Sequence, residues 1–262
     1  MVKLIVSDMD GTLLDDNKNL PSNFEEVYNQ LQNRDINFVI ASGRPSYSLR
    51  HEFVNLKHNI IFIADNGAYI GTKPTASILG SIDFKEIECI IEEVRKQPEL
   101  NLIICTDTIA YIENKDWDFF TTAYQYYKNL AMADSLDFVA DSILKIAIHN
   151  SNKWGNELPD TFKPLEDKLN FSLSGDHWLD IMPKGINKGA ALQKLQSTLN
   201  VTKDETMVFG DFLNDLEMMQ AAKYSYAMKN AHPKIIETAN FLAPKNTESG
   251  VTQTIIDQVL NK

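Results

Sequence analysis

Two aspartates near the start of the chain have the residue type and the spacing that chemistry at a metal site requires. Asp8 and Asp10 follow a short apolar run, residues 4–6, which is typical of a strand buried on both faces. Because residues i and i+2 of a strand point to the same side, both carboxylates should project together beyond its carboxyl end. Two carboxylates held that close repel one another unless a cation lies between them or one of them keeps a proton.

The next residues, Gly11 and Thr12, fit an anion beside those carboxylates. Glycine lets the backbone turn sharply, and Thr12 can offer a hydroxyl and an exposed N–H. The stretch therefore predicts a magnesium site with one carboxylate free to attack. An isolated pair of aspartates is more often an acidic turn on a solvated surface, so the remaining sequence must decide between the two interpretations.

Further polar residues follow other apolar runs. Ser42, Gly43 and Arg44 come after residues 36–41, and a second acidic group follows residues 206–209, namely Asp211, Asn214 and Asp215. If the strand over 206–209 lies beside the first strand, Asp211 and Asp215 face Asp8 and Asp10 across one crevice.

The elements that must position these residues alternate between strand and helix. Ser22 and Glu25 form a capping-box pattern before an amphipathic helix, residues 46–56 predict another helix, and Asn66-Gly67 marks a hairpin turn after a strand over 60–64. Strand and helix alternate again from residue 187, with Lys188 in the first turn of a helix and a strand over 224–228 before two further helices. This alternation predicts an α/β fold with a doubly wound parallel, Rossmann-like sheet, in which ligands bind beyond the carboxyl ends of the strands.

Residues 84–183 follow a different pattern, which predicts an inserted α+β module between core segments 1–83 and 184–262. The predicted elements are a helix over 84–94, a hairpin over 102–112, an aromatic-rich helix over 117–127, a half-buried strand over 143–148, a helical segment running to 169 and a hairpin over 171–181. Four aromatic residues share one helical face and are interpreted as packing residues: Trp117, Phe120, Tyr124 and Tyr127.

The composition restricts the partners. The chain has 262 residues, 44% of them hydrophobic, and a net charge of −11. With no basic run to offset that charge, a nucleic-acid or anionic-membrane partner is not expected, and an anionic substrate needs a local positive site. We expect a cytoplasmic protein, because the sequence shows no leader, no apolar run of about 20 residues, and two cysteines, Cys89 and Cys105, interpreted as buried thiols. The histidines at 51, 58, 149, 177 and 232 show no ligand spacing, so no zinc site is expected.

The ordered motifs resemble those of the haloacid dehalogenase superfamily, and within it the Cof-type sugar-phosphatase branch with a large type IIB cap. The resemblance rests on Asp8-x-Asp10-Gly11-Thr12, then Ser42-Gly43-Arg44, Lys188, and Gly210-Asp211-x-x-Asn214-Asp215. It implies a Mg²⁺-dependent phosphatase that hydrolyses small phosphorylated metabolites through an aspartyl-phosphate intermediate. Hexose phosphates, other small phosphomonoesters and pyridoxal phosphate are substrates that it suggests.

The resemblance also implies roles for individual residues. Asp8 is expected to be the nucleophile and Asp10 the general acid and base, whose acid step requires a raised pKa. Mg²⁺ is expected to bind Asp8, the backbone carbonyl of Asp10, Asp211 and, directly or through water, Asp215. The phosphoryl and substrate contacts are expected from Met9, Thr12, Ser42, Gly43, Arg44, Lys188 and Asn214.

Other interpretations remain open at this point. Lys188 alone would more often be a solvated lysine, although a cation in the first helical turn opposes the helix dipole and becomes sensible if it binds phosphate. Arg44 is either a substrate contact or an ion-pair partner. A phosphomutase or phosphotransferase could use the same aspartates, and a phospho-acceptor module of the receiver type also has an acidic pocket, but lacks the insertion and the Asp10 acid/base.

Overall fold

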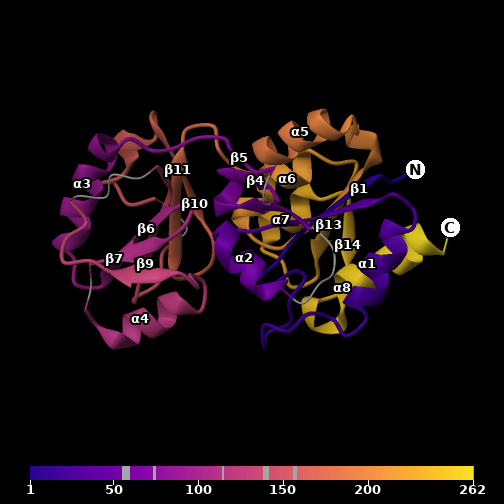
Figure 1. Ribbon diagram of the computed structural model, residues 1–262, viewed down its shortest axis with the longest axis horizontal. Coiled ribbons are helices and arrows are strands. Elements are labelled where there is room, and N and C mark those ends of the chain that lie inside the picture. The colour runs from indigo at the N-terminus through magenta and orange to yellow at the C-terminus, as the bar shows by residue number, and fades with distance from the viewer. Residues whose placement is uncertain (55–59, 73–74, 114, 138–141, 156–157, 262) are drawn as a thin grey trace.

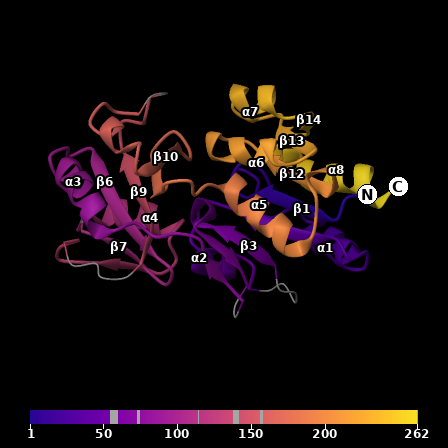
Figure 2. The same cartoon turned by 90° about the horizontal axis from the view of Figure 1, so that it is seen from above.

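The structure is a computed structural model that describes residues 1–54, 60–72, 75–113, 115–137, 142–155 and 158–261. Its strands form two separate sheets, which lie side by side along the long axis of the molecule (Figure 1). Both termini lie at the far end of the larger sheet, and the smaller sheet is built from the middle of the chain (Figure 2). The predicted α/β fold with an inserted α+β portion is confirmed.

The larger sheet has the order β14-β13-β12-β1-β2-β3-β4-β5, parallel from β14 to β3 and antiparallel beyond it. Its strands are β1 (Leu4–Asp8), β2 (Asn37–Ala41), β3 (Ile61–Ala64), β4 (Tyr69–Gly71), β5 (Ser77–Ile78), β12 (Thr206–Gly210), β13 (Tyr224–Met228) and β14 (Phe241–Ala243). The hairpin predicted at Asn66-Gly67 is confirmed, since β3 and β4 pair antiparallel across the 3-10 helix η1 (Asp65–Gly67).

The register of the central strands brings the predicted site residues to one edge. Val6 of β1 pairs with Val208 on one side and with Val39 on the other. The same register places Asp8 opposite Ala41. Residues that follow the ends of β1, β2 and β12 therefore emerge together at the carboxyl edge of the sheet.

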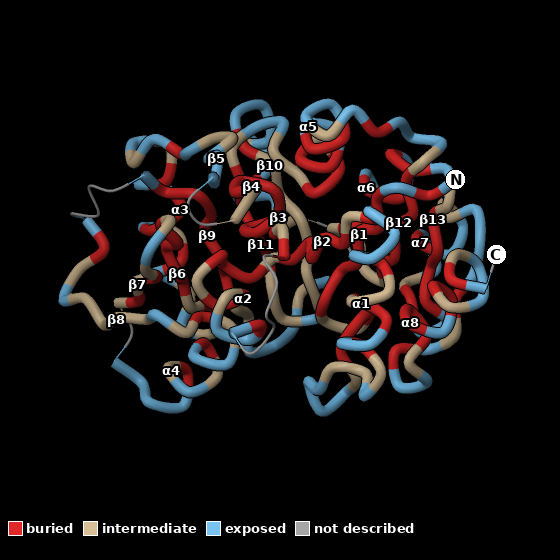
Figure 3. The backbone as a smooth tube through the Cα atoms, turned by 45° about the vertical axis from the view of Figure 1, so that its right-hand side comes forward, coloured by how far each residue is buried: buried red, intermediate tan, exposed pale blue. Residues whose placement is uncertain are grey.

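Helices cover the larger sheet, because packing against it buries the apolar face of each helix. They are α1 (Phe24–Gln32), α2 (Ser46–Glu52), α5 (Lys188–Leu199), α6 (Leu216–Gln220), α7 (Pro233–Thr238) and α8 (Gly250–Ile255), which a π-helical turn, Ile256–Leu260, extends. Helices α5 and α6 pack against each other, and α1 packs against α8. The buried backbone in Figure 3 follows the central strands and the inner helix faces, which is where the apolar core lies.

The smaller sheet has the order β10-β11-β9-β6-β7-β8 and is antiparallel except between β7 and β8. Its strands are β6 (Leu100–Thr106), β7 (Ala110–Ile112), β8 (Leu130–Met132), β9 (Ile143–Asn150), β10 (Leu169–Leu173) and β11 (Trp178–Pro183), and its helices are α3 (Phe84–Arg95) and α4 (Trp117–Tyr124). Both hairpins predicted in this portion, β6–β7 and β10–β11, are confirmed.

Several local predictions are wrong, and each has a tertiary or steric cause. Ser22 does not cap helix α1, which begins at Phe24 after Asn23 without a side-chain cap. The side-chain oxygen of Asn23, Oδ1, accepts a hydrogen bond from the Thr252 hydroxyl instead of from a backbone N–H. Of the helical segment predicted to run to 169, the described residues form only a 3-10 turn at Lys163–Leu165, and Pro164 lacks the backbone N–H that a longer helix would use. The strand predicted as half-buried, β9, is buried on both faces along its first six residues.

The cysteine and aromatic predictions are also partly wrong. Cys105 is buried, but Cys89 is exposed on α3. Trp117 and Tyr124 are 70% and 46% exposed on α4, so they do not pack as predicted. Tyr127 is buried, but it follows the end of the helix. The predicted helix over 46–56 ends at Glu52, and its last two residues, like His58, lie outside the described residues.

Within the described residues, none of the helices has the length and apolarity that spanning a bilayer requires.

Candidate active site

Asp8, Lys188 and Asp215 form a buried charge cluster at the carboxyl edge of the larger sheet. Asp8 is the last residue of β1, and Lys188 opens α5. The Lys188 Nζ atom lies 2.6 Å from the Asp8 carboxylate and 2.7 Å from that of Asp215. The lysine side chain has no exposed area, so its charge is neutralised by aspartates and not by water.

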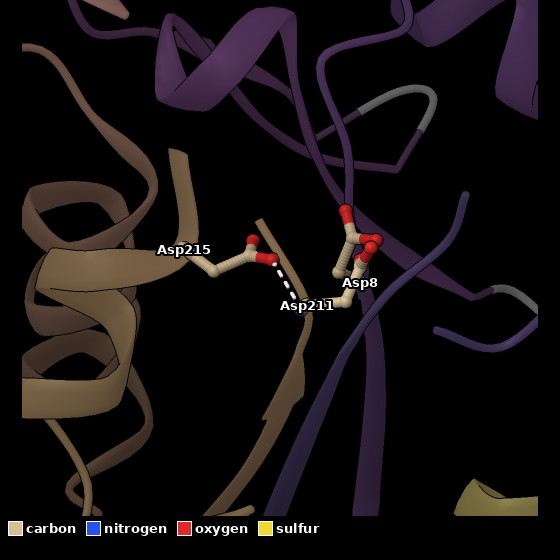
Figure 4. Close-up of side chains that lie close together, drawn as sticks. All are labelled: Asp8, Asp211 and Asp215. Carbon is tan, nitrogen blue, oxygen red and sulfur yellow. Dashed lines mark hydrogen bonds between the residues drawn. The ribbon is translucent and has the colours of Figure 1, made fainter. Parts of the chain in front are cut away.

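A third aspartate completes this acidic cluster. Carboxylate oxygens of Asp8, Asp211 and Asp215 all lie within 4.8 Å of one another. Figure 4 shows the Asp8 and Asp211 side chains next to each other, with Asp215 reaching them from the neighbouring turn. The second Asp215 oxygen accepts a hydrogen bond of 2.9 Å from the backbone N–H of Asp211, which fixes the loop after β12.

The cluster carries more negative charge than its single lysine balances. Burial raises the pKa of Asp8 to about 7, although Lys188 opposes the rise. Burial, with the Asp8 and Asp215 carboxylates, raises the pKa of Asp211 well above its usual range. Three carboxylates around one amine leave room for additional positive charge, and carboxylate oxygens are the ligands that hard divalent cations prefer.

Asp10 lies apart from this cluster in a second ion-pair group. Arg44 holds it in a bidentate contact, with Nε and Nη2 each 2.7 Å from a carboxylate oxygen, and Lys18 Nζ lies 2.9 Å from Asp10 Oδ1. Partial burial raises the pKa of Asp10, but Arg44 and Lys18 outweigh it and the net pKa is lowered. The raised pKa expected for Asp10 is therefore wrong in this structure, because two cations stabilise its ionised form.

The structure places the predicted phosphate contacts around the same edge, several of them already hydrogen-bonded to protein. Ser42 is buried, and its hydroxyl oxygen accepts the Arg44 backbone N–H at 3.1 Å. Met9 is fully buried beside them, and its carbonyl accepts the N–H groups of residues 13 and 14. The Thr12 hydroxyl donates to Asp211 at 2.8 Å, so in this structure it contacts a carboxylate and not an anion site.

Asn214 and Gly43 form hydrogen bonds with residues for which the motifs predicted no role. The Asn214 amide donates to Asn66 Oδ1 at 3.1 Å, and Asn66 in turn donates to Asp180 Oδ2 at 2.6 Å. The Gly43 carbonyl accepts from Lys145 Nζ at 2.7 Å. Lys145 and Asp180 belong to β9 and β11 of the smaller sheet, so these contacts connect the two sheets at the site.

Two glycines let the backbone approach closely here. Gly11 has φ +83°, and a Cβ there would lie 2.4 Å from an Asp211 oxygen. A Cβ on Gly189 would lie 2.5 Å from backbone and side-chain atoms of Glu217, so glycine brings the start of α5, and with it Lys188, against α6.

A cavity of about 440 Å³ opens over the cluster and is shared by both portions of the chain. Asp8, Asp10, Ser42, Gly43, Arg44, Asp211 and Asn214 line it from the larger sheet. Residues around the smaller sheet, among them Tyr126, Lys145, His149, His177, Trp178 and Asp180, close it from the other side. Sequence reasoning missed this second group, because no spacing rule connects residues that meet only after the two portions fold together.

The sequence model of one protein family, haloacid dehalogenase-like hydrolase, matches residues 5–255. The chain belongs to the haloacid dehalogenase-like hydrolases. The resemblance that the four motifs predicted is confirmed by this match over nearly the whole chain.

Individual members of the haloacid dehalogenase-like hydrolases resemble the chain over its full length. A 5-amino-6-(5-phospho-D-ribitylamino)uracil phosphatase of Escherichia coli is 31% identical over 265 residues, which cover 99% of this chain and 96% of that protein. A Bacillus subtilis phosphatase of the same name is 28% identical, with 99% and 96% covered. The crystal structure of SMU.1108c from Streptococcus mutans superposes with a TM-score of 0.91 at 32% identity and covers 100% of both chains. This haloacid dehalogenase-like hydrolase is therefore a phosphatase.

Proposed function

We propose that the chain is a Mg²⁺-dependent phosphatase that hydrolyses small phosphomonoesters through an aspartyl-phosphate on Asp8. The observation that carries the proposal is the cluster of Asp8, Asp211 and Asp215. Lys188 contacts Asp8 and Asp215 in this cluster, and Asp8 and Asp211 line the cavity. We further propose residues 1–83 and 184–262 as the catalytic core and residues 84–183 as its cap.

The residues present fit a divalent cation. The Asp8, Asp211 and Asp215 carboxylates offer only oxygen, lie within 4.8 Å of one another and have one lysine between them. Asp8 and Asp211 would hold the Mg²⁺ ion, with Asp215 supporting them from the loop. When bound, the ion would neutralise charge on the phosphoryl oxygens and lower the raised pKa of the nearby carboxyls.

Asp8 would act as the nucleophile. Its carboxylate oxygen forms a bond to phosphorus while the bond from phosphorus to the ester oxygen breaks. Lys188 holds that carboxylate at the end of β1 and places positive charge where the phosphoryl group arrives. The buried Ser42 hydroxyl and the N–H groups near Met9 and Gly43 would orient the phosphoryl oxygens.

Asp10 would move the protons. In the first step it gives a proton to the departing alkoxide, and in the second it takes one from the water that cleaves the aspartyl-phosphate and releases inorganic phosphate. Arg44 and Lys18 keep Asp10 ionised in this structure, which suits the second step. The first step requires these contacts to loosen so that the carboxyl can carry a proton.

The substrates are proposed to be small metabolites, because the cavity of about 440 Å³ is closed on one side by the cap. Two relatives are named for 5-amino-6-(5-phospho-D-ribitylamino)uracil, and an HMP-PP phosphatase of Enterobacter is 27% identical. A phosphorylated metabolite of this size is therefore the first class to screen.

The proposal is tested by p-nitrophenyl phosphate hydrolysis with Mg²⁺. We expect turnover that EDTA abolishes and Mg²⁺ restores, with equal release of p-nitrophenol and inorganic phosphate. Asp8→Asn should lose this turnover. The matched control is Asp167→Asn, which changes an exposed aspartate of the cap. Full turnover by Asp8→Asn would contradict the covalent route, and transfer of phosphate without its release would indicate a mutase.

A further inference from the structure

The cap side of the cavity presents an aromatic wall, defined as Tyr126, His149, His177 and Trp178, all of which line the cavity. Their rings are in mutual contact: Trp178 lies 5.7 Å from Tyr126 and 4.8 Å from His149, between ring centroids. His149 and His177 stack at 5.5 Å with an interplanar angle of 19°. The four side chains are each partly exposed, so the wall offers ring surface to the cavity and is not sealed into the core.

The Nδ1 atoms of the two histidines in this wall have different surroundings. A ring nitrogen of His177, Nδ1, lies 2.7 Å from the Asn150 carbonyl oxygen. The His149 Nδ1 atom is buried and has no hydrogen-bond partner. Burial and the neighbouring His177 lower the pKa of His149, which keeps this ring neutral at pH 7.

Charged residues beside the wall are already paired. Lys145 directs its amine to the Gly43 carbonyl at 2.7 Å, the Tyr127 hydroxyl at 3.2 Å and Asp180 at 3.2 Å. Three contacts use all three ammonium protons of a lysine. Asp176 pairs with Lys153 at 2.7 Å, so within the described part of the cap no unpaired cation lines the cavity.

The core side offers no spare cation either. Arg44 and Lys18, the cationic lining residues described there, both contact Asp10. A leaving group that carried its own carboxylate or second phosphate would need a cation of its own in a chain of net charge −11. Such a group would have to break one of these ion pairs before it could bind.

We infer that this phosphatase selects phosphomonoesters whose leaving group is uncharged and carries a planar ring, which stacks on the aromatic wall. The inference rests on the proposed function, because it assigns the part of the substrate beyond the phosphoryl group. Tyr126, His149 and Trp178 are the specificity-determining residues, because an aromatic surface binds a flat ring by stacking.

Matched substrates test the inference in the wild-type protein. Ribose 5-phosphate, uridine 5′-monophosphate and orotidine 5′-monophosphate share one phosphorylated sugar and differ by a planar ring and then by a carboxylate on it. Ribitol 5-phosphate and flavin mononucleotide form a second pair with an open-chain linker. We expect kcat/KM to rise roughly tenfold or more from the ring-free to the ring-bearing member of at least one pair, and to fall by a similar factor with the added carboxylate.

Variants locate the preference. Trp178→Leu, and independently His149→Leu, should bring the ratio of kcat/KM between ring-bearing and ring-free substrates close to one. Trp117→Leu is the matched control, because Trp117 is 70% exposed on α4 and does not line the cavity; it should keep the wild-type ratio. No ring preference in either pair, an unchanged ratio in both wall variants, or a preference for the orotidine ester would overturn the inference.

Binding measurements separate this inference from the proposed function. Calorimetric titration of Asp8→Asn with the same phosphates gives dissociation constants that do not depend on turnover. Tighter binding of the ring-bearing esters without any hydrolysis by the wild type would support the aromatic wall and overturn the phosphatase mechanism. Hydrolysis of acetyl phosphate and p-nitrophenyl phosphate, with no preference for the ring-bearing esters in the matched pairs, would support the phosphatase mechanism and overturn the role of the aromatic wall.

Discussion

At the scale of single residues, the lysine at the start of α5 is the centre of the charge balance. Lys188 is fully buried and contacts two of the three clustered carboxylates. Desolvation opposes its charge, but Asp215 and Asp8 together raise the pKa of Lys188. The amine therefore keeps its proton at neutral pH.

Replacing Lys188 with methionine should reduce activity and expose the repulsion in the cluster. We expect kcat/KM to fall on the order of 10²–10³, as for loss of a preorganised charge, and the melting temperature to fall most in EDTA, where nothing else offsets the aspartates. Lys194→Met, an exposed position on the same helix, is the control. Unchanged kinetics in Lys188→Met would rule out a role for this amine in the reaction.

A second residue-scale prediction concerns Arg44. Because Arg44 and Lys18 lower the pKa of Asp10, Arg44→Gln should raise that pKa. The protonated acid required in the first step then persists to higher pH, so the alkaline limb of the kcat profile should move upward. A pH profile of p-nitrophenyl phosphate hydrolysis measures this, and a limb that stays in place would exclude Asp10 as its origin.

At the scale of elements, the turn between β3 and β4 contains a buried carboxyl, Asp65, whose ionised form destabilises the fold. Asp65 is 1% exposed in η1, with φ +50° and neither carboxylate oxygen in a well-formed hydrogen bond. Burial raises its pKa to about 7, although Lys145 and the Ser46 N–H oppose the rise. The folded state therefore binds this proton more tightly than the unfolded chain does.

The sign of the linkage follows from that raised pKa. The unfolded aspartate titrates near its usual value of about 3.9, so this group lowers the stability progressively as pH rises from about 4 to about 7. Asp65→Asn keeps a residue that tolerates positive φ and removes the charge. We expect it to stabilise the protein by a few kcal/mol (order-of-magnitude estimate) at pH 8 and by less at pH 5, measured by urea unfolding against Asp167→Asn.

At the scale of the whole molecule, a buried ion pair joins the cap to the core. Lys145 and Asp180, each 2% exposed in the side chain, lie on adjacent cap strands. Lys145 donates to Gly43 of the core, and Asp180 accepts from Asn66 of the core. These contacts hold the loops that carry Ser42 and Asn214 against the cap.

Breaking the pair at one end should loosen the molecule at this contact. Lys145→Met leaves Asp180 buried without its cation, a change that typically costs about 3–5 kcal/mol, and we expect a lower melting temperature and a higher KM. The double variant Lys145→Met/Asp180→Asn removes both charges and should recover much of the stability, but not the KM. Equal recovery of both would mean that the pair has no part in positioning the loops.

Local sequence determined the elements that carry the site and the order in which they occur. The short apolar runs at residues 4–6 and 206–209 predict buried strands, because a strand that is covered on both faces of a sheet is apolar at every position. Parallel pairing then brings the residues after these strands to one edge of the sheet. Asp211 and Asp215 could thus be predicted to face Asp8 on the condition that the strand over 206–209 lies beside the first strand, and the structure shows that it does. The Ser22 capping box failed because helix α1 begins at Phe24, so that Asn23 and not Ser22 precedes it, and the Asn23 side-chain oxygen accepts a hydrogen bond from Thr252.

Tertiary structure alone decided the electrostatic state of the site and its far wall. Whether the pKa of Asp10 is raised or lowered depends on where the Arg44 and Lys18 side chains lie. The order of residues along the chain does not give the distances from these side chains to Asp10. The aromatic wall joins Tyr126, after α4, to His149 and Trp178 on two paired strands. Periodicity describes neighbours within one element, whereas this surface exists only because separate elements of the smaller-sheet portion pack against one another.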